Sequence, residues 1–225
     1  MTTLDQVPFD NVEFADNPEP RCACLLLLVT SGSMKGAKIE QLNAGLVAFA
    51  EQLRGDAMAA KRVEIAVVTF GPVNVIQNFV TADTFAPATL AASGNTPMGA
   101  AIERAVALVS ERKKAYRANG IGYYRPWIFL ISDGEPTDDI TAATALIRKG
   151  EAKKSFMFYP VGVENADIGK LAQIAVRQPL RLKGLSFRQL FVWLSDSLSS
   201  VSRSQVSDAP DLTNPAAPGG WAKAE

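Results

Sequence analysis

The sequence predicts an α/β fold in which a mostly parallel central sheet is covered by helices on both faces, a doubly wound arrangement. Short apolar runs of strand length alternate with longer segments whose apolar residues recur every three or four positions. Two strands lie close enough in sequence to form a hairpin, and helical crossovers join the others, which makes them parallel. The 225 residues are 48% hydrophobic and 20% charged, which suits one globular domain with a sizeable core.

The first buried strand is the run of four leucines and a valine that begins at Leu25. The run ends in small hydroxyl residues and glycine, which is typical of a buried parallel strand entering a turn. A helix is expected over residues 35–53, with Ser33 as its N-cap. Hydroxyl groups therefore gather at the carboxyl end of a buried strand, where open α/β sheets place ligand sites.

The elements that follow alternate in the same way. Residues 63–71 and 73–82 are predicted to be two strands separated by Gly71-Pro72, most simply an antiparallel hairpin at one sheet edge. The remaining expected elements are a helix from 98 that ends before Gly120, a strand at 125–134, a helix at 140–154, a strand at 156–164, a short helix at 168–176, a strand at 179–184 and a last helix at 187–201.

The alternation divides the chain into three parts. Residues 1–20 form an N-terminal extension, residues 21–201 the α/β domain, and residues 202–225 a tail rich in proline, glycine and alanine. Trp221 does not suit a fully solvated tail, so we expect it to dock on its own domain or on a partner. Apolar residues of the extension could form an edge pairing or lie over the domain: Val7, Phe9, Val12 and Phe14.

Composition excludes several classes of function. Lysine plus arginine and aspartate plus glutamate both total 23, so no global charge attracts nucleic acid or an anionic membrane. The chain has no histidine, which rules out a Ser-His-Asp triad, a Cys-His pair and a His-ligated zinc ion. We find no signal peptide and no apolar run long enough to span a bilayer, so a cytoplasmic protein is expected.

Four hydroxyl and carboxyl residues follow the order of a known motif. Ser31 and Ser33 end the first strand, Thr96 lies in a later loop, and Asp133 ends a later strand. This arrangement resembles the von Willebrand factor A (vWA) domain, whose Asp-x-Ser-x-Ser motif, threonine and second aspartate form a metal-ion-dependent adhesion site. The resemblance implies a Rossmann-like fold and covers roughly residues 21–200. The sequence departs from the motif at Val29, which occupies the position of the first aspartate.

The resemblance implies that Ser31, Ser33, Thr96 and Asp133 bind Mg²⁺ or Mn²⁺, because these ions prefer oxygen ligands. Val29 removes one carboxylate, so metal binding is expected to be weak or absent. A second carboxylate could come from a partner or from residues near the end of the same strand as Asp133, namely Glu135, Asp138 and Asp139.

Three functions follow as hypotheses. The first is a non-catalytic module that binds a partner protein at the Ser31/Ser33/Thr96/Asp133 face. The resemblance is to the stand-alone bacterial TerY/YegL-like group, which implies a role in tellurium resistance, stress response or signalling and a kinase- or phosphatase-linked partner. The second is a metal-free scaffold that binds through other surfaces or the tail. The third is a metal-assisted hydrolase, which lacks a recognisable nucleophile–base pair here.

Overall fold

The core of the protein is a seven-stranded sheet of order β3-β2-β1-β4-β5-β6-β7. We describe a computed structural model of residues 12–164, 166–206, 212–217 and 220–224. The strands are β1 (Cys22–Val29), β2 (Val63–Phe70), β3 (Asn74–Thr81), β4 (Trp127–Ser132), β5 (Met157–Gly162), β6 (Leu180–Leu182) and β7 (Ala222–Ala224).

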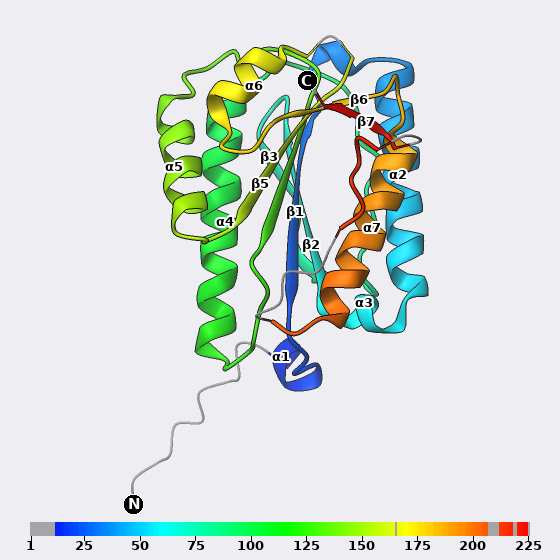
Figure 1. The fold of residues 1–225 in the computed structure, drawn as a ribbon, viewed down its shortest axis with the longest axis vertical. Helices are drawn as coiled ribbons and strands as arrows, with labels where there is room; N and C mark the ends of the chain where they lie inside the picture. The colour runs from blue at the N-terminus through cyan, green and yellow to red at the C-terminus, as the bar shows by residue number, and fades with distance from the viewer. Residues whose placement is uncertain (1–11, 165, 207–211, 218–219, 225) are drawn as a thin grey trace, which may run out of the picture.

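Helices cover both faces of this sheet, as the sequence predicts (Figure 1). One face carries α2, α3 and α7, and the other carries α4, α5 and α6 (Figure 1). Their bounds, with the short α1 and the 3₁₀ helix η1, are α1 (Val12–Asp16), η1 (Gly32–Met34), α2 (Ala37–Gly55), α3 (Ala57–Arg62), α4 (Met98–Ala118), α5 (Thr141–Ala152), α6 (Ile168–Ile174) and α7 (Phe187–Arg203).

Strand β1 lies in the interior of the sheet, between β2 and β4, and is buried along its whole length. It pairs in parallel with β2 and with β4, and Leu27 is level with Val68 on one side and Leu130 on the other. Strand β5 pairs in parallel with β4, with Ser132 level with Gly162. The carboxyl ends of β1, β4 and β5 therefore lie side by side at one edge, which positions the site described below.

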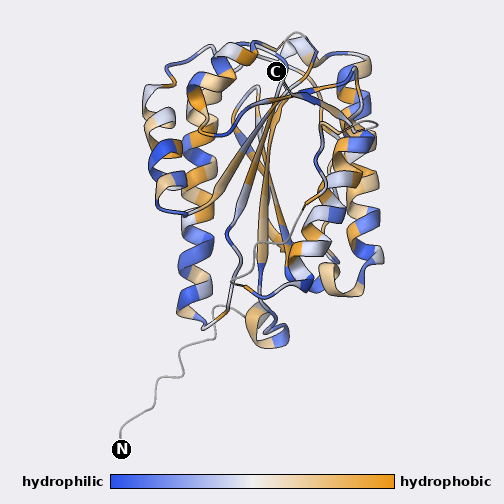
Figure 2. Ribbon diagram, viewed as in Figure 1, coloured by the Kyte–Doolittle hydropathy of each residue, from blue (hydrophilic) through white to orange (hydrophobic). Residues whose placement is uncertain are grey.

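Hydropathy follows the layers of the fold (Figure 2). Apolar residues concentrate in the strands and on the helix faces that pack against them, while hydrophilic residues lie on the outer helix faces (Figure 2). The two cysteines, Cys22 and Cys24, are free thiols with no exposed surface at the start of β1. Within the described residues, none of the helices combines the length and apolar character needed to cross a membrane.

The sheet is antiparallel at both edges rather than at one. The expected hairpin is present, since β2 pairs antiparallel with β3. At the opposite edge β7 pairs antiparallel with β6, so residues 222–224 belong to the sheet and correct the expectation that everything after residue 201 forms a separate tail. Strand β7 has only three residues, alanine, lysine and alanine, so its sequence shows no strand pattern. It forms because it pairs with β6, a segment distant in the sequence.

Two short helices were not predicted as helices. Of the two arrangements predicted for the extension, Phe14 in helix α1 has the second and lies over the domain, buried edge-to-face against Tyr116 with 5.9 Å between ring centroids. Val7 and Phe9 lie outside the described residues. Helix α3 was not expected; Asp56 caps it by accepting hydrogen bonds from the Met58 and Ala59 amides, both 3.1 Å.

Candidate functional site

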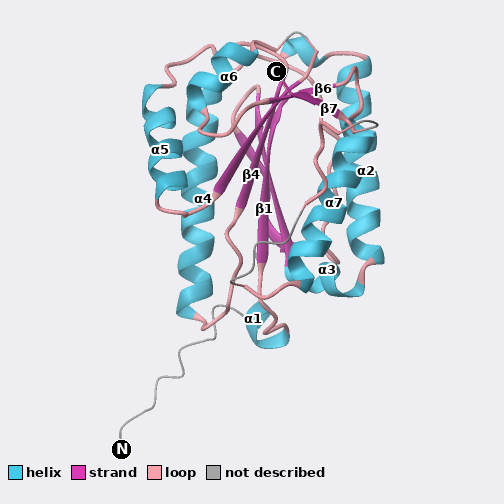
Figure 3. Ribbon diagram, viewed as in Figure 1, coloured by secondary structure: helices cyan, strands magenta, loops and turns pink. Residues whose placement is uncertain are grey.

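The candidate site lies where the carboxyl ends of β1, β4 and β5 meet the start of α2. In Figure 3 it is the band of loops above the strands, at the end opposite α1. Three loops close over this edge: Ser31 lies between the carboxyl end of β1 and η1, the Ser93–Gly94 loop precedes α4, and Asp133 follows β4. The Gly32 amide donates to the Gly94 carbonyl (3.0 Å), which ties the first two loops together.

A chain of hydrogen bonds joins three of the predicted site residues. The hydroxyls of Ser31 and Ser33 are 2.8 Å apart, and Ser33 donates to Oδ1 of Asp133, also at 2.8 Å. Ser31 and Asp133 are buried, whereas Ser33 is exposed. The prediction that Ser33 is the N-cap of α2 is wrong, because its hydroxyl bonds Asp133. Gly36, with φ +77°, is the residue that precedes the helix.

Thr96, the fourth predicted residue, lies beside the same loop. Its amide donates to Oγ1 of Thr137 (3.1 Å), and its carbonyl accepts from the Thr137 amide (2.9 Å). Its side chain is nearly buried and lies against Gly134, the residue after Asp133. The structure thus brings all four hydroxyl and carboxyl residues to one edge of the sheet, with Thr96 outside the hydrogen-bonded chain.

The carboxyl group of Asp133 is paired with a cation that the sequence analysis missed. Nζ of Lys38, in the first turn of α2, lies 3.1 Å from Oδ2 of Asp133 and 3.2 Å from Oε2 of Glu164. Glu164 follows β5 at the same edge, so the second carboxylate of the site comes from a third strand end. One ammonium group thus bridges two carboxylates.

The environment of Lys38 favours its charged form. Burial opposes the charge and by itself lowers the pKa of Lys38, but the hydrogen bonds and negative charges of Asp133 and Glu164 outweigh it and raise that pKa above its ordinary value. A lysine in the first turn of a helix also faces the positive end of the helix dipole. The two carboxylates compensate both costs.

Of the three carboxylates predicted as substitutes for the motif's first aspartate, two cap helices and the third is exposed. Oδ1 and Oδ2 of Asp138 accept hydrogen bonds from the Gly99 and Ala100 amides (3.0 and 2.9 Å), which caps α4 from a distant loop. Asp139 accepts from the amide and hydroxyl of Thr141 at the start of α5, and these bonds lower the pKa of Asp139. Glu135 is exposed.

Val29, which we predict to take the place of the motif's first aspartate, is fully buried. It is level with Phe70 of β2 and extends the apolar core to the edge of the sheet. A valine at this position offers the neighbouring Ser31 and Ser33 hydroxyls neither a negative charge nor a hydrogen-bond acceptor.

The contacts of these residues decide whether they suit a divalent cation. Mg²⁺ needs oxygen ligands with enough negative charge to replace part of its hydration shell. Here Oδ1 of Asp133 accepts from Ser33, Oδ2 contacts Lys38, and Val29 supplies no oxygen. Within the described ranges, no group of three or more acidic, cysteine or histidine side chains is placed to hold a metal ion. The residues present do not fit a divalent cation in this arrangement.

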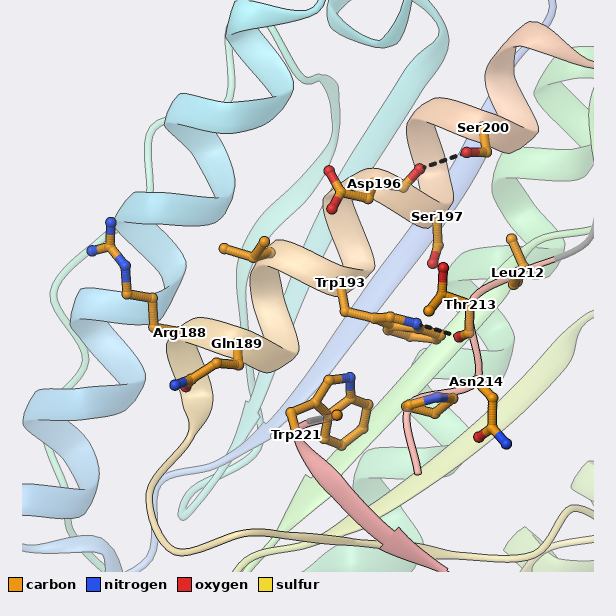
Figure 4. Close-up of a pocket in the computed structure, with 13 residues that line it drawn as sticks. Arg188, Gln189, Trp193, Asp196, Ser197, Ser200, Leu212, Thr213, Asn214 and Trp221 are labelled. Atoms are coloured by element: carbon orange, nitrogen blue, oxygen red, sulfur yellow. Dashed lines mark hydrogen bonds between the residues drawn. The ribbon is translucent and has the colours of Figure 1, made fainter. Parts of the chain in front are cut away.

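A separate cavity of about 440 Å³ lies between α7 and the C-terminal segment (Figure 4). Trp193 and Trp221 lie on its wall with ring centroids 5.6 Å apart, and the Trp193 indole donates to the Thr213 carbonyl (2.7 Å) (Figure 4). Trp221 is 3% exposed and its buried Nε1 has no hydrogen-bond partner among the described residues. The expectation that Trp221 docks is confirmed, and it docks on its own domain.

Sequence reasoning missed Lys38 and Glu164, although each left a signal. Lys38 places a positive charge in the first turn of a helix, where an acidic residue is normally favoured. Glu164 comes two residues after the end of β5, and Asp133 directly after the end of β4. The distances that pair them, however, depend on how β1, β4 and β5 are ordered in the sheet.

Comparisons with known proteins identify the family and the fold of this chain. The family model for the von Willebrand factor type A domain matches residues 25–188. No curated protein sequence matches the chain. Among solved structures, the pilus adhesin SpaC from Lactobacillus rhamnosus GG aligns with a TM-score of 0.63 and 9% identity over 82% of this chain.

Two further structures align in a similar way. The vWF domain of the type V pili tip protein Mfa5 from Porphyromonas gingivalis gives a TM-score of 0.60 at 11% identity over 83% of this chain and 98% of that domain. Proximal thread matrix protein 1 from the mussel byssus gives 0.55 at 17% identity over 81% of this chain. The chain spans 31% of SpaC and 49% of the mussel protein. At identities this low, the structural likeness establishes a shared fold and nothing more. The protein belongs to the von Willebrand factor type A domain family.

Proposed function

We propose that this protein is a non-catalytic interaction module that binds a partner protein at the carboxyl edge of its sheet. The observation that carries the proposal is the bonded chain from Ser31 through Ser33 and Asp133 to Lys38, placed where three parallel strands end. Open α/β sheets bind ligands at this edge. Ser33 is exposed there, so a partner can reach this row of hydrogen-bonded side chains.

The proposal includes a weakened or lost metal site, because Val29 replaces a carboxylate ligand of the family motif. Mg²⁺ or Mn²⁺ binding at this edge is common in vWA domains, and Ser31, Ser33, Thr96 and Asp133 are the residues that would contribute oxygen ligands. The likeness to the bacterial TerY/YegL-like group supports a cytoplasmic role in stress response or signalling, with a kinase- or phosphatase-linked partner. A hydrolase is the less favoured function, because the sequence has no histidine to act as a general base and the Asp133 carboxylate next to the Ser33 hydroxyl is paired with Lys38.

Site-specific photo-crosslinking tests the face. A photoreactive amino acid is placed at Glu135, which is exposed beside Asp133, and as a control at Lys114, which is exposed near the far end of α4. We expect a specific crosslinked protein from position 135 in the host cell and none from position 114. The product should disappear when Ser33→Ala is added, and mass spectrometry of it shows whether the partner is a kinase or phosphatase.

The alternative function is a scaffold that binds through other surfaces or the C-terminal segment. A third photoreactive probe at Lys223, which is exposed on β7, distinguishes this scaffold from the proposed binding face. Crosslinks from position 223 or 114 without any from position 135 would contradict the proposed face. Turnover of a phosphoester substrate that is lost in Asp133→Asn would contradict the non-catalytic assignment.

A further inference from the structure

We propose that the Lys38 ammonium is the built-in cation of this site, so that the domain keeps its charge balance and its binding face without a divalent metal. The inference concerns the face assigned in the proposed function, but its chemistry stands on the contacts of Lys38 alone. A tethered cation differs from a bound metal in a simple way: it is always present and cannot be removed by a chelator.

The first argument is the burial of Asp133. Its side chain has no exposed surface, and a buried carboxylate is costly unless it is paired and hydrogen-bonded. Ser33 donates to one oxygen and Lys38 contacts the other, so both requirements are met within the chain. A divalent ion is not needed to hold this carboxylate.

The second argument is competition for the same oxygens. A metal ion at Oδ2 of Asp133 would have to displace the ammonium group, and one at Oδ1 would compete with the Ser33 hydroxyl and be opposed by the positive charge of Lys38 on the same carboxylate. The Lys38 side chain is 17% exposed, so the group is largely enclosed by the site. Because Val29 supplies no carboxylate, a metal ion would gain too little negative charge from the site to offset the loss of the Lys38 ion pairs.

The third argument is the unusual backbone conformation of Glu164, whose side chain contacts Lys38. Its φ is +44°, a left-handed conformation that residues with a side chain rarely adopt. The Arg181 guanidinium donates to the Glu164 carbonyl and holds the segment in place. Strained residues concentrate at functional sites, and this one delivers the second carboxylate to the ammonium group.

Metal titration of five proteins tests the inference without any partner. Isothermal calorimetry with Mn²⁺ and Mg²⁺ compares the unchanged chain, Lys38→Met, Val29→Asp, the double variant, and the control Lys35→Met, which removes an exposed lysine three positions earlier. We expect no binding to the unchanged chain or to Lys35→Met. The double variant should bind Mn²⁺ about tenfold tighter or more than Val29→Asp, because a neighbouring positive charge no longer opposes the metal.

Thermal unfolding, measured first in a chelator and then in chelator-free buffer with Mn²⁺, supplies the second readout. Lys38→Met should unfold at a lower temperature than the unchanged chain and recover part of the difference when Mn²⁺ is added, while Lys35→Met should behave like the unchanged chain. If Lys38→Met does not fold, Lys38→Gln keeps a hydrogen-bond donor and takes its place. Mn²⁺ binding to the unchanged chain as tight as to the double variant would overturn the inference. Equal binding by Val29→Asp and the double variant would also overturn it. A failed search for a partner would leave both readouts unaffected.

Discussion

Two clusters of charged side chains lie at opposite ends of the parallel strands, and they are built differently. At the amino ends, the fully buried Glu64 of β2 is paired with Arg21 (2.8 Å) and Arg112 (2.7 Å) and accepts a hydrogen bond from the Tyr116 hydroxyl. At the carboxyl ends, Lys38 bridges Asp133 and Glu164.

The difference lies in geometry and access. Two arginines and a tyrosine surround one carboxylate in the amino-end cluster, and planar guanidinium groups match carboxylate oxygens well. The carboxyl-end cluster reverses the ratio, since one compact ammonium serves two carboxylates, and Glu164 is 36% exposed. We infer that the first cluster serves stability and that the second is open to exchange with a partner.

The largest expected effect comes from Glu64→Gln. The substitution keeps the side-chain volume but leaves Arg21, 1% exposed, without its counter-charge, so the free energy of unfolding should fall by about 3–5 kcal/mol. Urea denaturation measures it. Glu111→Gln is the control: its pair with Arg104 is exposed, and its effect should stay within about 0.5 kcal/mol. A loss below about 1 kcal/mol for Glu64→Gln would show that the cluster is not structural.

Tyr116→Phe should cost about 1.5–3 kcal/mol at neutral pH, because it removes a hydrogen bond to a charged group. It also changes the response to alkali. Burial, and then the negative charge of Glu64, raise the pKa of Tyr116 well above its ordinary value of 10.0. A raised pKa stabilises the fold below pH 10.0, and the contribution is lost as pH rises through the higher folded value.

The stability advantage of the unchanged chain over Tyr116→Phe should therefore narrow as pH rises above 10.0. Urea titrations between neutral pH and the alkaline limit of folding measure this difference. Both proteins retain Cys22, whose pKa burial raises to about 12, so that source of alkaline instability cancels in the comparison. An advantage that stayed constant or widened would contradict the account.

Asp133→Asn is the counterpart of Glu64→Gln in the open cluster and should cost less, about 1 kcal/mol. Lys38 keeps Glu164 as a partner and is partly exposed, so no charge is left isolated. The same urea measurement compares the two amide variants directly. A cost for Asp133→Asn equal to that of Glu64→Gln would erase the distinction between the clusters.

The smallest expected effect is that of Glu164→Gly. Glycine loses a half-exposed ion pair with Lys38 but adopts the positive φ without strain, so stability should change by no more than about 0.5 kcal/mol. Glu164→Ala loses the same ion pair and keeps the strain, so it should be about 1 kcal/mol less stable than the glycine variant. Equal stability of the two variants, by urea denaturation, would show that the backbone there carries no strain.

Local patterns predicted most of the fold because its elements have a strong period. The eight buried residues of β1 and the apolar face of α7 are recognisable without knowing their neighbours. The ends of the chain were harder. Phe14 is buried in a helix of five residues, and β7 has three, so neither segment is long enough to show a period.

The sequence by itself determined the order of strands and helices and the placement of Ser31, Ser33 and Asp133 at one sheet edge, because parallel strands carry their carboxyl ends to the same side. Thr96 follows an antiparallel strand and a long loop, so only the resemblance to the vWA motif assigned it to that edge. Only the tertiary structure decided which charge Asp133 meets. Lys38 and Glu164 are separated along the chain and reach each other through long side chains, so their pairing depends on β1, β4 and β5 lying next to one another. The same holds for Trp221, whose burial depends on a strand pairing between distant segments rather than on its own neighbours.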